Sequence, residues 1–170
     1  KSLQSPLLLM IFLLLSCCKE KHSVPPNIIY ILADDLGYGD LGAFNPEGKI
    51  KTPHLDQMAH QGMIFTDAHT SSSVCTPTRY GILTGRYNWR SPLKKSVLSG
   101  TSQALIPQDR TTVASFLKNN GYQTAFIGKW HLGWDWALKD STFNNKPIKD
   151  HEIFEKIDFS KNITNSPNGL

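Results

Sequence analysis

The sequence places Cys75 where a reactive side chain could act on an anion. Pro77 is tolerated in a first helical turn and Gly85 fits just past a helix end, so the pattern predicts a helix over residues 76–84. Cys75 would then lie at or next to the N-cap, where free backbone N–H groups and the helix dipole stabilise negative charge. Arg79, one turn further on, adds a cation at the same end. We therefore predict an anion site that contains a reactive atom, with a buried structural cysteine as the alternative.

Two adjacent carboxylates, Asp34 and Asp35, follow the apolar run 27–33 and precede a glycine-rich turn. Neighbouring acids repel each other unless a cation or an arginine lies between them. Carboxylate oxygens are hard ligands that suit Ca²⁺ or Mg²⁺. The pair therefore indicates a metal site, and Asx turns or helix caps are the alternative.

A third polar cluster, Lys129 and His131, lies in the turn 128–133 after another apolar run. In an extended backbone, residues two apart project to the same side. We therefore expect these two side chains to act together. The alternative is a surface lysine beside a core histidine.

Three helices are expected from local signals. Thr52 as N-cap, Pro53 at the first position and Gly62 at the end delimit one of them. The second is the helix after Cys75, and the third begins at a cap on Thr111 or Thr112 and ends near Asn120. The inner stripe of the first helix would consist of Leu55, Met58 and Ala59.

Each polar cluster follows a segment with the composition of a strand, and helices separate the strands. This order implies a largely parallel sheet, and ligands of such sheets bind outside the carboxyl ends of the strands. We expect an α/β fold with a largely parallel (mixed) sheet flanked by helices, incomplete in this chain, and all polar clusters at one edge. Residues 87–108 show no clear hydrophobic periodicity of a helix or a strand, and they are interpreted as a solvated surface excursion. The expected strands are 27–33, 63–68 and 122–127.

Composition and charge exclude several classes. The chain has 170 residues, of which 39% are hydrophobic and 19% charged, as in globular rather than disordered proteins. The net charge of +4 comes without a dense basic run that contains aromatics, so we expect a small anionic ligand and no nucleic acid. Apart from Cys75, the sequence contains the two adjacent cysteines Cys17 and Cys18, and this arrangement excludes a disulfide framework.

The N-terminal apolar run 7–15 has the length of a signal-peptide core and is too short to cross a bilayer of about 30 Å. The run Leu14-Leu15-Ser16-Cys17 resembles a bacterial lipobox, in which Cys17 becomes the acylated first residue. We therefore predict a lipoprotein-type signal peptide at 1–16, a tether at 17–26 and a lipid anchor at Cys17. The expected location is the bacterial cell envelope, and a short buried core helix is the alternative for the apolar run.

The run Cys75-Thr76-Pro77-Thr78-Arg79, followed by Leu-Thr-Gly, resembles the signature of the type I sulfatases in the alkaline-phosphatase-like superfamily. All three polar clusters occur in the family's order over about 26–133. The resemblance implies that a maturation enzyme oxidises Cys75 to formylglycine. It further implies Ca²⁺ ligands at Asp34, Asp35 and Cys75, a formylglycine hydrate stabilised by Arg79 and hydrogen-bonded by His131, and sulfate held by Lys129.

By this resemblance, residues 27–170 correspond to the N-terminal part of a sulfatase catalytic domain, and we expect this part alone to be inactive. The predicted reaction is sulfate-ester hydrolysis by covalent catalysis, with sulfated glycans as substrates. Two alternatives stay open. One is a related phosphodiesterase or phosphonate monoester hydrolase, and the other is a non-catalytic glycan-binding lipoprotein.

Overall fold

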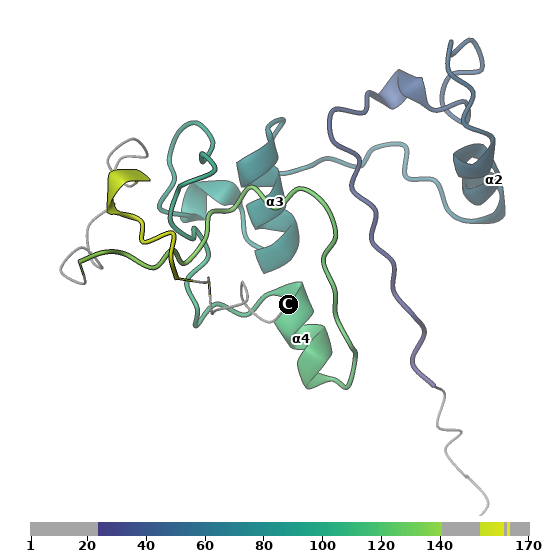
Figure 1. The fold of residues 1–170 in the computed structure, drawn as a ribbon. Helices are drawn as coiled ribbons and strands as arrows, with labels where there is room; N and C mark the ends of the chain where they lie inside the picture. Colours follow the sequence, from purple (N-terminus) through teal and green to yellow (C-terminus); the bar gives the residue numbers. More distant parts are fainter. Residues whose placement is uncertain (1–23, 141–153, 162, 164–170) are drawn as a thin grey trace, which may run out of the picture. The chain divides into compact units, whose positions relative to one another are not determined.

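The computed structural model describes residues 24–140, 154–161 and 163 (Figure 1). The chain divides into two units, residues 1–36 and 37–170. In the first unit, residues 24–36 form no helix or strand and end in a bend at Asp34 and Asp35. The second unit contains all helices of the described residues. The predicted signal peptide and Cys17 lie outside the described residues.

Helix α2 spans Pro53–Gln61, with Thr52 as N-cap and Gly62 as C-cap, as the sequence predicts. The Thr52 hydroxyl donates to Asp56 at 2.8 Å and accepts from the backbone N–H of Gly42 at 2.9 Å. These bonds tie the start of α2 to the loop that follows the 3₁₀-helix η1, Tyr38–Asp40. The predicted inner stripe was wrong, because Leu55 and Met58 are exposed in this structure.

Helix α3 spans Cys75–Thr84 and begins one residue earlier than expected. Gly85 ends it in the left-handed conformation, with φ 64°, and its N–H bonds to the Gly81 carbonyl at 2.9 Å. Glycine adopts this conformation without the steric cost that a Cβ adds. Helix α3 contacts both α4 and the 3₁₀-helix η2, Asn88–Arg90.

Helix α4 spans Val113–Asn119, and its N-cap is Thr112, one of the two threonines expected there. The Thr112 hydroxyl accepts from the Ser115 N–H at 3.1 Å, and the Ser115 hydroxyl accepts from the Thr112 N–H at 2.8 Å. This reciprocal pairing satisfies donors that the first turn of a helix otherwise leaves unpaired.

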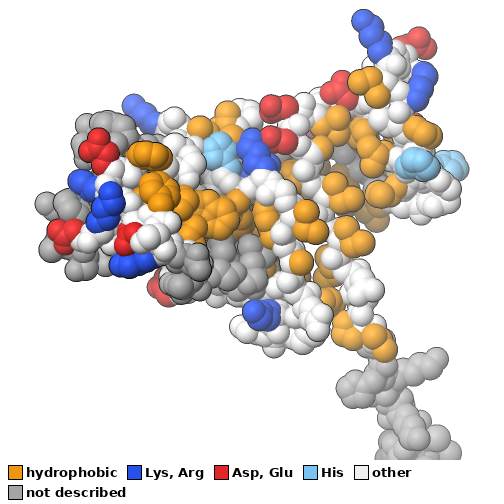
Figure 2. All heavy atoms as spheres, viewed as in Figure 1, with side chains coloured by type: hydrophobic (Ala, Val, Ile, Leu, Met, Phe, Trp, Pro, Cys, Tyr) orange, Lys and Arg blue, Asp and Glu red, His pale blue; other side chains and the backbone are white. Residues whose placement is uncertain are grey.

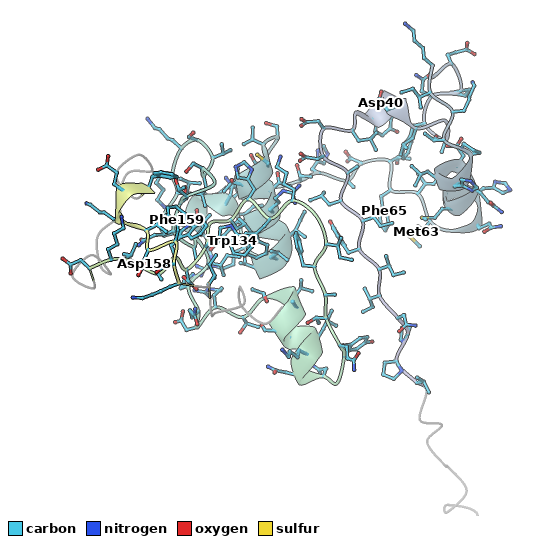
Figure 3. The ribbon with its side chains drawn as sticks, in the orientation of Figure 1. Asp40, Met63, Phe65, Trp134, Asp158 and Phe159 are labelled. Atoms are coloured by element: carbon cyan, nitrogen blue, oxygen red, sulfur yellow. The ribbon has the colours of Figure 1, made fainter. Side chains whose placement is uncertain are left out.

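A small core packs beneath α3. It consists of Tyr80 on the helix, Trp130 and Leu132 in the turn 128–133, and Leu105 and Ile106. The last two residues belong to 87–108, so the expected solvated surface excursion was wrong for this part of the segment. Tyr87 and Trp89, at its start, are exposed. Trp134 packs against this core and its ring lies 6.2 Å from that of Trp130 (Figure 3).

No strand forms within the described residues, which corrects the expected sheet. Two isolated bridges occur, one between Gln103 and Trp134 and one between Leu138 and Ile157. The segments 27–33, 63–68 and 122–127 carry apolar side chains that lie exposed, and hydrophobic atoms occupy much of the face in Figure 2. A helix satisfies its hydrogen bonds within one segment, whereas a strand needs a neighbour in register. Among the residues that the structure describes, none of these three segments pairs as a strand with another.

The labelled side chains of Met63 and Phe65 illustrate this exposure on the expected second strand (Figure 3). The short 3₁₀-helix η4, Phe154–Lys156, is the last element described. Within residues 24–140, 154–161 and 163, no helix has the length and apolar character needed to cross a membrane.

Candidate active site

Cys75 is the first residue of α3, and its thiol is free and half-buried. The N-cap Val74 has an extended backbone and offers no side-chain cap, so the positive end of the helix dipole lies at Cys75 without a capping oxygen. Ser72 supports the helix start: its carbonyl accepts from the Thr78 hydroxyl at 2.7 Å and its hydroxyl accepts from the Val74 N–H at 3.3 Å. The predicted position of Cys75 at the helix start is confirmed.

Arg79 lies one turn from Cys75 and is buried, with 8% of its surface exposed. Its guanidinium donates through Nη1 to the main-chain carbonyl oxygen of Lys129. This bond joins α3 directly to the turn that carries Lys129 and His131. The structure therefore brings two of the three predicted clusters together, although the Lys129 side chain itself is exposed.

His131 lies between the buried residues Trp130 and Leu132. Its backbone is left-handed, with φ 56°, so the extended geometry expected for this turn was wrong, and His131 is half-buried while Lys129 is exposed. Its Nε2 atom lies 2.6 Å from the carbonyl oxygen of Leu98. Its Nδ1 atom is buried and has no hydrogen-bond partner in the described part of the chain.

Two residues near the site escaped the sequence interpretation. Thr76 is fully buried, and its hydroxyl donates to the His131 carbonyl oxygen at 2.9 Å. Leu98 donates its N–H to the same hydroxyl at 3.3 Å. Thr76 belongs to the run 75–79, but the sequence of this run gives no sign of a partner 55 residues away.

Asp34 and Asp35 belong to the first unit and are exposed. Asp35 has a left-handed backbone with φ 61°, a conformation that costs an L-residue energy and that clusters at functional sites. Their oxygens match the chemistry that calcium requires, but two carboxylates are fewer than the six to eight ligands that Ca²⁺ takes. Among the residues that the structure describes, no three His, Cys, Asp or Glu side chains gather as metal ligands.

The charged side chains near Cys75 in the sequence are all positive over a long stretch. Between Asp67 and Asp109 the sequence contains no acidic residue. A run without carboxylates lowers the electrostatic cost of bringing an anion to the helix start. The cations within it are Arg79, Arg86, Arg90, Lys94 and Lys95.

A family model described as Sulfatase matches residues 26–168. The chain belongs to the sulfatase family. A sulfatase solved in the study of how Bacteroides thetaiotaomicron metabolises multiple glycosaminoglycans is 48% identical, with a TM-score of 0.62 over 65% of this chain and 23% of that one. The likeness shows that the chain has a sulfatase fold over this part, although its described residues form isolated bridges and no complete strand.

Two curated sulfatases show the same relationship. The N-acetylgalactosamine-6-O-sulfatase of Bacteroides thetaiotaomicron is 45% identical over 134 residues, which are 75% of this chain and 26% of the relative. The arylsulfatase A of Bos taurus is 49% identical over 109 residues, or 64% of this chain and 21% of the relative. This sulfatase chain thus spans about a quarter of the length of the curated relatives it matches.

Proposed function

We propose that the protein hydrolyses sulfate esters, with a formylglycine made from Cys75 as its nucleophile and calcium as its metal. The observation that carries this proposal is the start of α3, where Cys75 meets the positive helix end and the buried Arg79 binds the turn of Lys129 and His131. Membership of the sulfatase family supports the same reaction class.

In this proposal, one hydroxyl of the hydrated aldehyde attacks sulfur and displaces the alcohol of the ester. Deprotonation of the second hydroxyl then expels sulfate and restores the aldehyde. Arg79 and Lys129 place positive charge beside the sulfate, where it offsets the charge that moves in the transition state. The Nδ1 atom of His131 is the group that accepts a proton. Asp34 and Asp35 would hold calcium, whose charge favours the ionised nucleophile.

We infer a sulfated glycan as the substrate. The name of the relative from Bacteroides thetaiotaomicron specifies a sulfated N-acetylgalactosamine, and its sequence is 45% identical over the shared part. The acid-free stretch around Cys75 suits a polyanionic chain of this kind.

The test is sulfate release by the full-length protein, produced with a formylglycine-generating enzyme. We expect turnover of sulfated glycans and aryl sulfates, and loss of it in Cys75→Ala. Phosphate diesters and phosphonate monoesters serve as competing substrates. A preference for them would favour the related hydrolases, and binding of glycan without any turnover would favour a glycan-binding lipoprotein.

We also propose that acylated Cys17 holds the protein in the bacterial cell envelope, because the lipobox-like run ends at that residue. The measurement is fractionation of cells that produce the full-length protein or its Cys17→Ala variant. We expect the wild type in the membrane fraction and the variant outside it. Equal membrane retention of both would refute the anchor.

A further inference from the structure

A closed set of hydrogen bonds joins Thr76, Leu98 and His131, which are far apart in the sequence. The Thr76 hydroxyl donates to the His131 carbonyl oxygen at 2.9 Å and accepts from the Leu98 N–H at 3.3 Å. Nε2 of His131 lies 2.6 Å from the Leu98 carbonyl oxygen. Because each residue bonds to the other two, the start of α3, the loop at Leu98 and the turn 128–133 are held in one arrangement.

The Thr76 hydroxyl at the centre of this set makes two hydrogen bonds. Thr76 is 0% exposed, so no bulk water reaches it, and its hydroxyl both donates and accepts. A buried polar group that loses its partner costs free energy. Valine has nearly the same shape as threonine but no hydroxyl. Replacing Thr76 by valine would remove both bonds and leave the volume of the side chain almost unchanged.

The contact with Leu98 decides which nitrogen of His131 carries the proton. A carbonyl oxygen can only accept, so Nε2 must be the N–H donor in this bond. In the neutral imidazole, Nδ1 then keeps its lone pair and is the basic nitrogen. This Nδ1 atom is buried and bonds to no group that the structure describes.

The backbone of His131 needs support of its own. Its φ of 56° is left-handed, which costs an L-residue roughly 1–2 kcal/mol. Such conformations persist where the surroundings over-determine them. The bond from Thr76 acts on the carbonyl oxygen of this same residue. It therefore opposes relaxation of the turn.

We propose that Thr76 is a positioning residue for His131. Its hydroxyl holds the His131 backbone in the left-handed conformation and, through Leu98, keeps the imidazole in the Nε2–H tautomer with Nδ1 as the basic nitrogen. This inference rests on the proposed function, in which His131 accepts a proton during sulfate-ester hydrolysis.

The experiment compares Thr76→Val, Thr76→Ser and Thr84→Val in the full-length protein, produced with a formylglycine-generating enzyme. Thr84→Val is the matched control, because its hydroxyl also lies on α3 but bonds to the Tyr80 carbonyl within the helix at 2.6 Å. Three measurements are made: amide hydrogen exchange at Leu98, the ¹⁵N shifts of the His131 imidazole, and steady-state kinetics that give kcat and KM. The kinetic constants are divided by the formylglycine content, found by peptide mass spectrometry.

In Thr76→Val we expect about tenfold faster exchange at Leu98, a mixture of His131 tautomers, and kcat about tenfold lower with little change in KM. Thr76→Ser keeps the hydroxyl and should restore all three values, and Thr84→Val should leave them at wild-type levels.

Four results would overturn the proposal. One is an Nδ1–H tautomer of His131 in the wild type, a readout that does not depend on any variant folding. Wild-type kcat in Thr76→Val is another. Equal losses in the valine and serine variants are a third, because the hydroxyl that serine retains would then not suffice to position His131. A loss that disappears after correction for formylglycine content would assign Thr76 to maturation instead.

A wild type that carries formylglycine but releases no sulfate would refute the proposed function alone, since the exchange at Leu98 and the tautomer of His131 are measured without turnover.

Discussion

At position 75, a thiol, a hydroxyl and a hydrated aldehyde differ in how many oxygen atoms they offer to a sulfate ester. Cys75→Ser, in a host that leaves the serine unoxidised, supplies one hydroxyl at the start of α3, beside Arg79. That oxygen can still attack sulfur, with positive charge nearby to balance the transfer. Under the proposed mechanism it lacks the second hydroxyl that His131 would deprotonate, so the sulfated serine cannot break down. We predict one slow transfer per molecule and no turnover.

The measurement for Cys75→Ser is the intact-protein mass of the full-length variant after incubation with an activated aryl sulfate. The control is Cys75→Ala, which offers no oxygen and should gain no mass. Repeated turnover by the serine variant, or full activity of a wild type that retains an unmodified Cys75, would contradict the mechanism in which both hydroxyls are needed.

Among the elements, the helices were predicted correctly from the sequence, whereas the three expected strands do not form in the described residues. Pro53, Gly85 and Thr112 act within a few residues of their own helices, and the structure confirms each signal. An apolar run such as 27–33 indicates a strand only if another strand pairs with it, which local sequence does not contain. For the same reason, the sequence located Cys75 and Arg79 but missed Thr76, whose partner His131 comes from a distant turn.

The turn 128–133 can be tested through Gly133. This residue has φ 72°, and a Cβ at this position would overlap the carbonyl oxygen of Gln103. Gly133→Ala therefore combines a left-handed alanine with a clash against backbone, and we expect a loss of about 3 kcal/mol or more in the free energy of unfolding. Gly121→Ala is the control, because Gly121 has φ 85° but open space around it. It should cost only about 1–2 kcal/mol.

Urea-induced unfolding of the full-length protein, followed by tryptophan fluorescence, measures both glycine variants. Equal losses at the two positions would mean that Gln103 does not approach the turn as the structure describes. Because Trp130 donates to the Gly133 carbonyl at 2.7 Å, Gly133→Ala should also lower kcat through the neighbouring His131.

For the whole molecule, the small core holds the fold together, whereas the exposed apolar runs promote association. The core beneath α3 packs Tyr80 against Trp130 and Leu132, and this contact holds the helix and the turn 128–133 of the candidate site together. Ile29 and Ile127, by contrast, are 85% and 95% exposed on segments whose composition fits buried strands. Exposed apolar surface of this extent attracts other surfaces or other chains. Extended backbone outside a sheet adds to this tendency, because its N–H and C=O groups can pair with another chain.

We therefore predict that residues 24–170, produced alone, associate and do not melt cooperatively. The expected result in size-exclusion chromatography with light scattering is a mass above that of one chain, with strong binding of a hydrophobic dye. Replacing Ile29, Phe65 and Ile127 by threonine keeps β-propensity but removes apolar surface, so association should fall. Replacing the exposed Lys94 and Lys95 by glutamine is the matched control and should leave association unchanged. A monomer with a sharp melting transition would show that these segments are covered within a single chain, which would contradict the prediction.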